Sequence, residues 1–132
     1  MKYKKILVTG GAGFVGSHIC LKLKERLVKT ELVAFDNLIR KGSELNVPRL
    51  EEAGVRFIKG DVRNRKDLEI EGVDLIIECS AEPSVMAGVN SSPEYLLDTN
   101  LGGAVNCFEL ARKANADIIF LSTSRVYPVK RL

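Results

Sequence analysis

The sequence has few of the residues that build crosslinked or metal-binding proteins. Of its 132 residues, three are cysteine and one is histidine. Cys20, Cys79 and Cys107 are odd in number, lie far apart and form no C-x-x-C pair, which favours reduced thiols over a disulfide framework. His18 alone cannot form a histidine-rich metal site, so we expect no bound metal. A Ser-His-Asp triad would need this same residue as its base.

Long apolar runs are also absent. The longest cover residues 6–8, 75–77 and 118–121, whereas a membrane-spanning helix needs about 20 apolar residues. We therefore expect a cytoplasmic protein with no membrane segment. The net charge of +3 is scattered over several predicted elements without interleaved aromatic residues, which argues against a nucleic-acid partner.

The composition that remains is that of a globular protein. Hydrophobic residues make up 45% and charged residues 28% of the chain, with only four prolines. These proportions exclude disorder, collagen and coiled coil as descriptions of the whole chain. A chain of this length predicts one domain, residues 1–132.

Short apolar runs alternate with helical patterns along the chain. The runs predict strands at residues 6–9, 31–35, 56–59, 74–79 and 118–121. A helix is predicted from Phe14 onward, because apolar residues recur at every fourth position: Val15, Ile19, Leu23 and Leu27. Residues 42–53 can hold only a short helix, since Pro48 lies inside them, and residues 65–68 a single helical turn.

The second half of the chain predicts a loop at residues 80–91 and then the longest helix, residues 93–114. Its expected apolar stripe consists of Leu97, Leu101, Ala104, Val105, Phe108 and Ala111. Strands and helices that alternate with short connections predict an α/β fold. Right-handed crossovers give a parallel, Rossmann-type doubly wound sheet of about five strands in the order 3-2-1-4-5, with any ligand at the carboxyl ends of the strands.

A glycine-rich segment joins the first strand to the first helix. Residues 9–16 read Thr-Gly-Gly-Ala-Gly-Phe-Val-Gly, which fits G-x-G-x-x-G when started at Gly11 and G-x-x-G-x-x-G when started at Gly10. In both registers Gly13 lacks a Cβ that would hold a diphosphate away, and Gly16 lets the helix approach the strand. The helix N-terminus attracts the anion. The alternative is a tight turn without a ligand.

Asp36 supports the ligand hypothesis. It ends the second predicted strand 20 residues after Gly16, the offset expected for a carboxylate that accepts from the adenosine ribose hydroxyls. A carboxylate there repels a 2′-phosphate and favours NAD over NADP, although the nearby Arg40 and Lys41 keep NADP open. Asp61 ends the third strand and can reach the adenine edge, or can cap its own turn.

Five segments resemble, in order, the extended short-chain dehydrogenases/reductases. They are TGGAGFVGS at residues 9–17, DNL at 36–38, GDVR at 60–63, NLGG at 100–103 and STSRVY at 122–127. Within this group the chain is similar to NAD-dependent sugar-nucleotide epimerases and dehydratases such as UDP-galactose 4-epimerase. The segments AEPSV at 81–85 and STSRVYP resemble CDP-paratose/tyvelose 2-epimerases.

The resemblance implies a role for each matching residue. Gly10, Gly13 and Gly16 would seat the diphosphate, Asp36 the adenosine ribose, and Asp61 with Val62 the adenine. Ser80 and Ala81 would line the nicotinamide-side ribose and Asn100 would steady the cofactor region. Ser124 would hydrogen-bond the sugar hydroxyl, although residues 122–124 also suit an ordinary polar strand exit. The other implied cofactor-binding residues are Gly11, Phe14, Val15 and Asn37. Glu78 departs from the family, which usually has histidine there.

The resemblance also implies a tyrosine followed four residues later by lysine as the catalytic pair, in which the lysine lowers the phenol pKa. Here Tyr127 is followed by Lys130 in a Y-x-x-K spacing, with Arg131 at the fourth position, and this does not match. The sixth strand and the substrate domain are missing too. We therefore expect the NAD-binding half of such an enzyme, which binds NAD without turnover and handles a nucleotide sugar only if a second half completes it.

Two other interpretations remain open at this stage. The chain can be a non-catalytic dinucleotide-binding module, or half of a split enzyme completed by a partner chain. The apolar fifth strand at a sheet edge also predicts self-association, and the long helix could be a dimer surface, as its counterpart is in the family.

Overall fold

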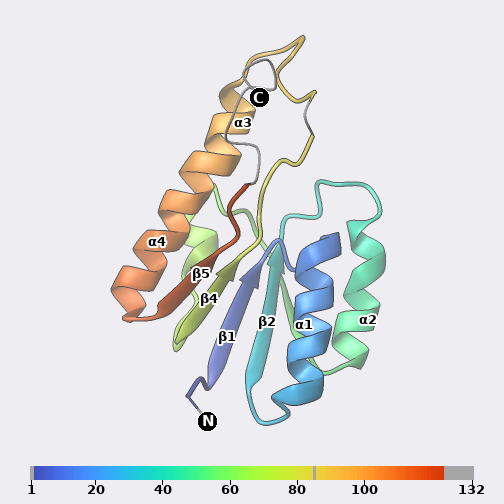
Figure 1. Ribbon diagram of the computed structural model, residues 1–132, viewed down its shortest axis with the longest axis vertical. Coiled ribbons are helices and arrows are strands. Elements are labelled where there is room, and N and C mark those ends of the chain that lie inside the picture. Colours follow the sequence, from blue (N-terminus) through green and yellow to red (C-terminus); the bar gives the residue numbers. More distant parts are fainter. Residues whose placement is uncertain (1, 85, 124–132) are drawn as a thin grey trace, which may run out of the picture.

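Five runs rich in branched apolar residues form the strands of one parallel sheet (Figure 1). The computed structural model describes residues 2–84 and 86–123. The strands are β1 (Lys5–Thr9), β2 (Glu31–Asp36), β3 (Arg56–Lys59), β4 (Leu75–Glu78) and β5 (Asp117–Phe120). They lie in the order β3-β2-β1-β4-β5 and every pair is parallel, which confirms the predicted topology.

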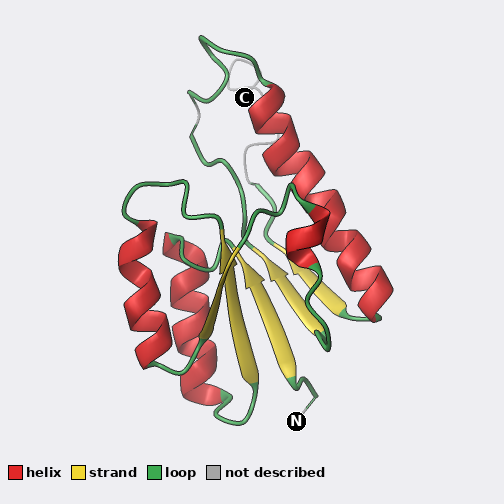
Figure 2. Ribbon diagram, turned by 180° about the vertical axis from the view of Figure 1, so that it is seen from behind, coloured by secondary structure: helices red, strands yellow, loops and turns green. Residues whose placement is uncertain are grey.

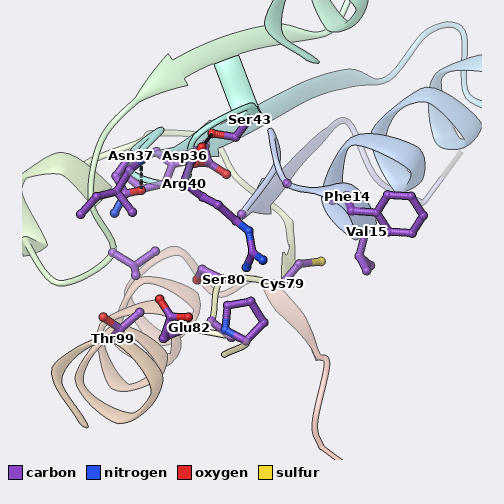
Figure 3. Close-up of a pocket in the computed structure, with 18 of the residues that line it drawn as sticks. Phe14, Val15, Asp36, Asn37, Arg40, Ser43, Cys79, Ser80, Glu82 and Thr99 are labelled. Atoms are coloured by element: carbon purple, nitrogen blue, oxygen red, sulfur yellow. Dashed lines mark hydrogen bonds between the residues drawn. The ribbon is translucent and has the colours of Figure 1, made fainter. Parts of the chain in front are cut away.

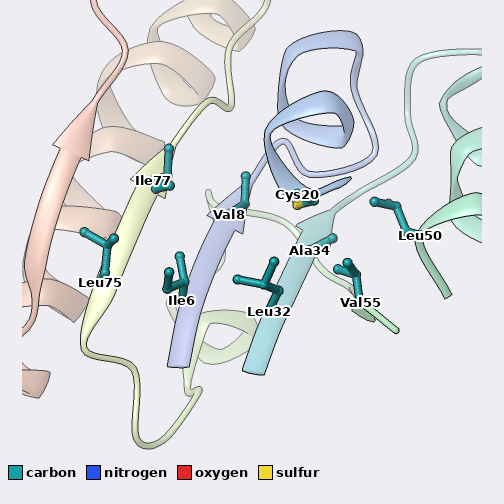
Figure 4. Packing of buried hydrophobic residues seen from close by; sticks show 9 residues of the cluster. All are labelled: Ile6, Val8, Cys20, Leu32, Ala34, Leu50, Val55, Leu75 and Ile77. Atoms are coloured by element: carbon teal, nitrogen blue, oxygen red, sulfur yellow. The ribbon is translucent and has the colours of Figure 1, made fainter. Parts of the chain in front are cut away.

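The three central strands are buried on both faces, as their unbroken apolar sequences require. Their side chains alternate between two core clusters. One cluster includes Ile6, Val8, Leu32 and Ala34 beneath the helix that follows β1 (Figure 4). The other cluster lies on the opposite face of the sheet. It includes Leu7 of β1, Val33 and Phe35 of β2, and Ile76 of β4. The sheet therefore has a helical layer on each side.

The first layer consists of α1 (Phe14–Arg26) and α2 (Asn46–Glu52), which follows a short 3-10 turn η1 (Ser43–Leu45). Figure 2 shows both helices on the same side of the sheet. Helix α2 is short as predicted. Pro48 is its third residue, where the missing N–H is not needed because the first turn has no intrahelical acceptor.

The predicted apolar stripe of α1 is only partly its buried face. Its buried residues are Gly16, Ser17 and Cys20, while Ile19, Leu23 and Leu27 pack partly buried against the core. Val15 is 47% exposed, because it faces the pocket described below. Small residues thus set the contact between this helix and the sheet.

The predicted helix at residues 93–114 is three segments in the structure. These are α3 (Glu94–Leu97), a π-helical stretch η3 (Asp98–Gly102) and α4 (Gly103–Ala114). Helix α4 covers the second face of the sheet, beside the 3-10 turn η2 (Arg65–Leu68).

The predicted stripe of this helix lies on two faces. Ala104 and Ala111 are buried against the sheet, as is Cys107, which the stripe did not include. The larger stripe residues are exposed: Leu97, Leu101, Val105 and Phe108. A π-helical turn holds more residues than an α-helical turn. The side chains before Gly103 therefore face a different direction from those after it. In residues 2–84 and 86–123, no helix combines the length and apolar character that a membrane crossing needs.

Candidate functional site

A sharp corner connects β1 to α1. Gly10 has φ +60°, a left-handed conformation that favours glycine, and the N–H of Gly13 donates to the Gly10 carbonyl at 3.0 Å. A Cβ on Gly10 would lie 2.8 Å from the Cys79 carbonyl oxygen. Gly13 caps α1 without a side chain, and the first turn has no acidic residue. The backbone N–H groups of this first turn have no acceptor within the helix, so the start of α1 attracts an anion.

The Asp36 carboxylate lies beside this glycine corner. Its Oδ2 accepts from the backbone N–H of Ala12 at 3.1 Å, and its Oδ1 accepts from that of Leu38 at 2.9 Å. Each oxygen keeps a lone pair for a hydroxyl group. A diol acceptor and an anion-attracting helix start are thus neighbours at the carboxyl ends of β1 and β2.

Both features open into one pocket of about 440 Å³. This volume lies in the range of small-molecule and cofactor sites. Figure 3 shows the pocket between the loops that follow β2 and β4, with Phe14 and Val15 at one side. The sequence-predicted residues that line it are Gly10, Gly13, Phe14, Val15, Gly16, Asp36, Asn37, Val62, Ser80 and Ala81.

Three predicted site residues do not line the pocket. Gly11 packs beneath it, where a Cβ would lie 2.8 Å from Ala34 Cα. Asn100 contacts the loop after β4, where its Oδ1 accepts from the Glu82 backbone N–H at 2.8 Å. Asp61 is engaged by other side chains. Ser124 lies outside the described residues, as do Tyr127 and Lys130.

The Asp61 carboxylate already accepts four hydrogen bonds. Its Oδ1 accepts from the backbone N–H and the Nε of Arg63, and its Oδ2 from the Arg63 Nη2 and the Asn37 side-chain amide, at 2.7 to 3.1 Å. The guanidinium of Arg63 is the main reason that the Asp61 pKa falls to about 2. All four favoured acceptor positions are filled, so a further donor such as adenine would have to compete with Arg63.

Glu78 is a buried carboxyl at the end of β4, only 2% exposed. Its Oε1 accepts from the Thr9 hydroxyl at 3.3 Å, from the Ser80 N–H at 3.0 Å and from the Ser80 hydroxyl. Burial raises the Glu78 pKa, and these hydrogen bonds oppose the rise. Burial also raises the pKa of the neighbouring Cys79 thiol to about 12. Glu78 thus holds Ser80 at the pocket wall, and Cys79 stays a thiol.

A glycine corner beside an aspartate at the end of the next strand is the arrangement expected of a dinucleotide site. Comparison with known protein families identifies the family of the chain. The model of the NAD dependent epimerase/dehydratase family matches residues 6–131. The chain belongs to this family. The resemblance predicted from the five sequence segments is therefore confirmed, including the parallel sheet that the family shares.

Two curated relatives and one solved structure illustrate the similarity. The CDP-paratose 2-epimerase of Salmonella typhi is 32% identical over 130 residues, covering 93% of this chain and 38% of the relative. The UDP-glucose 4-epimerase of Klebsiella pneumoniae is 33% identical over 131 residues, covering 93% and 91%. The crystal structure of the Bifidobacterium longum UDP-glucose 4-epimerase in complex with NAD+ and UDP superposes with a TM-score of 0.80 at 29% identity. That match covers 93% of this chain and 38% of that structure. The chain thus spans about two fifths of the length of the first of these relatives and of the solved structure.

Several residues that line this pocket were not among the predicted site residues, although Gly60, Glu82 and Pro83 lie in the quoted segments GDVR and AEPSV. They are Phe35, Ile39, Arg40, Ser43, Gly60, Cys79, Glu82, Pro83, Tyr95 and Thr99. Tyr95 and Thr99 are four residues apart in a predicted helix. The sequence could therefore have placed them on the same helix face. Among the described residues, Thr99 has the one buried side-chain oxygen without a hydrogen-bond partner. The sequence marked Arg40 only as a cation near Asp36 that keeps NADP open, and no pattern marked Ser43 as a pocket residue.

A chain of side-chain contacts links the two walls of the pocket. The Tyr95 hydroxyl donates to Glu82 Oε2 at 3.3 Å, and the Arg63 guanidinium lies 5.3 Å from the centre of the Tyr95 ring. Arg63 in turn pairs with Asp61, which Asn37 holds from the end of β2. The loop after β4 is thereby joined to the loops after β2 and β3.

Proposed function

We propose that the chain binds NAD in this pocket and forms the cofactor-binding half of a sugar-nucleotide epimerase or dehydratase. One observation carries the proposal: the Asp36 carboxylate is hydrogen-bonded to Ala12 of the glycine corner. This bond places an acceptor for ribose hydroxyls next to a helix N-terminus that suits a diphosphate. Family membership and the NAD-bound relative add independent support.

The proposed cofactor pose follows the pocket walls. The diphosphate lies over Gly10, Gly13 and Gly16, with Gly11, Phe14 and Val15 shaping the corner. Asp36 and Asn37 hold the adenosine ribose, and Val62 faces the adenine beside Asp61, whose carboxylate stays paired with Arg63. Ser80 and Ala81 line the nicotinamide-side ribose, and Glu78 holds Ser80 in place. Asn100 supports the same loop through its hydrogen bond to the Glu82 backbone. Bound NAD would supply a reversible hydride acceptor for a nucleotide-sugar carbon, whose hydroxyl Ser124 would hydrogen-bond.

The same carboxylate selects the cofactor. A 2′-phosphate in place of the ribose 2′-hydroxyl would bring like charges together at Asp36 and remove the donor that this carboxylate needs. We therefore propose NAD over NADP. Replacing Asp36 with asparagine keeps the size of the side chain and one acceptor oxygen, and removes the charge.

Calorimetric titration and thermal unfolding test this proposal together. NAD should raise the melting temperature of the chain, with a stabilisation of about 2.7 kcal/mol at a free concentration of 100 times the Kd. Asp36→Asn should weaken NAD binding about tenfold and narrow the preference over NADP. The exposed Glu52→Ala, at the end of α2, is the matched control and should bind like the wild type. An unchanged midpoint in millimolar NAD would refute the proposal.

The proposed half-enzyme should bind without turning over. The tyrosine and lysine pair that the resemblance implies is absent from the printed 132 residues, so we expect no conversion of a nucleotide sugar by this chain alone. Turnover would then require residues outside these 132 that supply that pair. The cytoplasmic location stays a prediction, which cell fractionation tests.

We also propose that the chain self-associates or pairs with a partner chain. Support comes from the apolar side chains exposed on the α3–α4 segment and at β5, among them Leu101 at 63% and Phe108 at 43% exposure. Phe108 contacts Phe120 of β5, with ring centres 5.6 Å apart, which makes the exposed surface continuous. Sedimentation at working concentration should show a species larger than the monomer.

A further inference from the structure

The pocket contains one cationic side chain among its described lining residues, Arg40. Two carboxylates, Asp36 and Glu82, line the same pocket. The glycine corner offers backbone N–H groups to an anion but no full positive charge. A diphosphate carries two negative charges, so Arg40 is the one lining group able to offset them with a formal charge.

Hydrogen bonds on both sides of Arg40 hold its backbone in place. Before it, Leu38 adopts φ +58°, a conformation that bulky residues rarely take. The N–H of Leu38 donates to Asp36, and that of Ile39 donates to the Asn37 side chain at 3.0 Å. After it, both the N–H and the hydroxyl of the buried Ser43 donate to the Arg40 carbonyl, at 3.1 and 2.7 Å. The base of the Arg40 side chain is therefore fixed relative to Asp36.

The Arg40 side chain extends away from Asp36 and across the pocket. Figure 3 shows its guanidinium directed toward Ser80 and Cys79 on the opposite wall. Within the described residues the guanidinium forms neither an ion pair nor a hydrogen bond, and it is exposed to solvent. Among the described residues, its donors therefore have no protein acceptor in the pocket that Gly10, Gly13 and Gly16 also line.

We propose that Arg40 binds the diphosphate of the dinucleotide, on the side opposite the start of α1. The anion would then lie between the first-turn N–H groups of the helix and a guanidinium whose planar donors match phosphate oxygens. This assignment rests on the proposed NAD-binding function. A role on a 2′-phosphate fits less well, because the ribose end of the site is marked by Asp36, from which the guanidinium points away.

Binding of ligands with and without a diphosphate tests the assignment. We would titrate the wild type, Arg40→Gln and Lys41→Gln with NAD, ADP-ribose, adenosine and NADP. Lys41 is the adjacent exposed cation and does not line the pocket, so its variant controls for net charge. Arg40→Gln should weaken NAD and ADP-ribose by about tenfold or more and leave adenosine unchanged. It should also reduce the salt dependence of NAD binding, while Lys41→Gln matches the wild type with every ligand.

The other outcomes overturn the assignment in distinguishable ways. Equal NAD affinity in wild type and Arg40→Gln would reject the contact while leaving the proposed function intact. A loss confined to NADP would place Arg40 on the 2′-phosphate, and an equal loss for adenosine would show that the substitution disturbs the loop. A wild type that binds neither NAD nor ADP-ribose would refute the proposed function itself.

Discussion

Alanine at Gly13 should weaken NAD binding at least about tenfold and leave the fold intact. Gly13 has φ −70° and ψ 175°, which alanine adopts readily. Its added Cβ would meet only one atom closely, the Gly10 carbonyl oxygen at 3.1 Å. The smaller entropy of the unfolded alanine chain stabilises the fold by about 0.4–1 kcal/mol and offsets this contact. We expect a net change in stability within about 1 kcal/mol.

The effect of Gly13→Ala on the ligand is larger. The new methyl group enters the pocket, where the proposed diphosphate approaches the first-turn N–H groups of α1. Loss of one hydrogen bond to a charged group costs about 1.5–3 kcal/mol, which corresponds to roughly a tenfold to hundredfold loss of affinity.

Gly16→Ala, unlike Gly13→Ala, should destabilise the fold. A Cβ on Gly16 would lie 2.8 Å from the Gly10 carbonyl carbon and 2.9 Å from Gly11 Cα, and closer still to the Gly10 oxygen. These are backbone atoms that cannot rotate away, so we expect a destabilisation of about 1–3 kcal/mol or more. In a domain of this size, 1 kcal/mol lowers the Tm by roughly 4 °C.

Urea unfolding without ligand and calorimetry with NAD separate the two effects. Gly13→Ala should unfold near the wild-type midpoint and bind NAD at least about tenfold more weakly. Gly16→Ala should unfold at clearly lower urea. Wild-type NAD affinity in Gly13→Ala would refute the close approach of the diphosphate, and wild-type stability in Gly16→Ala would refute the tight helix contact.

Two further predictions concern pH. The folded-state pKa of Glu78 is raised above the ordinary 4.5, so its contribution to stability is present below that value and is lost as the pH rises through the folded pKa. Glu78→Gln should therefore gain stability relative to the wild type as the pH rises above about 4.5, and a constant difference in melting temperature would contradict this. The pKa of Asp61 is lowered from 3.8 to about 2, so its contribution is present above 3.8 and is lost as the pH falls through about 2. Acid titration of Asp61→Asn should show a shallower loss of stability in that window than the wild type, and parallel curves would count against the Arg63 pairing.

Local patterns were sufficient to predict most of the fold. The apolar runs of β1, β2 and β4 are long enough and sharply enough bounded to be recognised as buried strands, and their order follows from the handedness of crossovers. The glycine corner is equally local, because the left-handed φ of Gly10 and the start of α1 at Phe14 depend on neighbouring residues.

Packing between distant segments decided what the patterns could not. The apolar residues of α4 follow one helical repeat, yet Ala111 is buried and Phe108 is exposed, because only close approach to the sheet selects between them. Similarly, GDVR marked Asp61 as a ligand candidate, while its filled hydrogen-bonding capacity depends on where Asn37 and Arg63 meet it.

The sequence by itself determined the strand order, the glycine corner and the placement of Asp36 at the end of β2, since each depends on spacing along the chain. Only the tertiary structure decided which side chains share the pocket. Arg40, Tyr95 and Thr99 enter it from loops and helix turns whose paths are set by contacts across the sheet. Proximity between residues so far apart in the chain is a property of the folded packing, which no local spacing encodes.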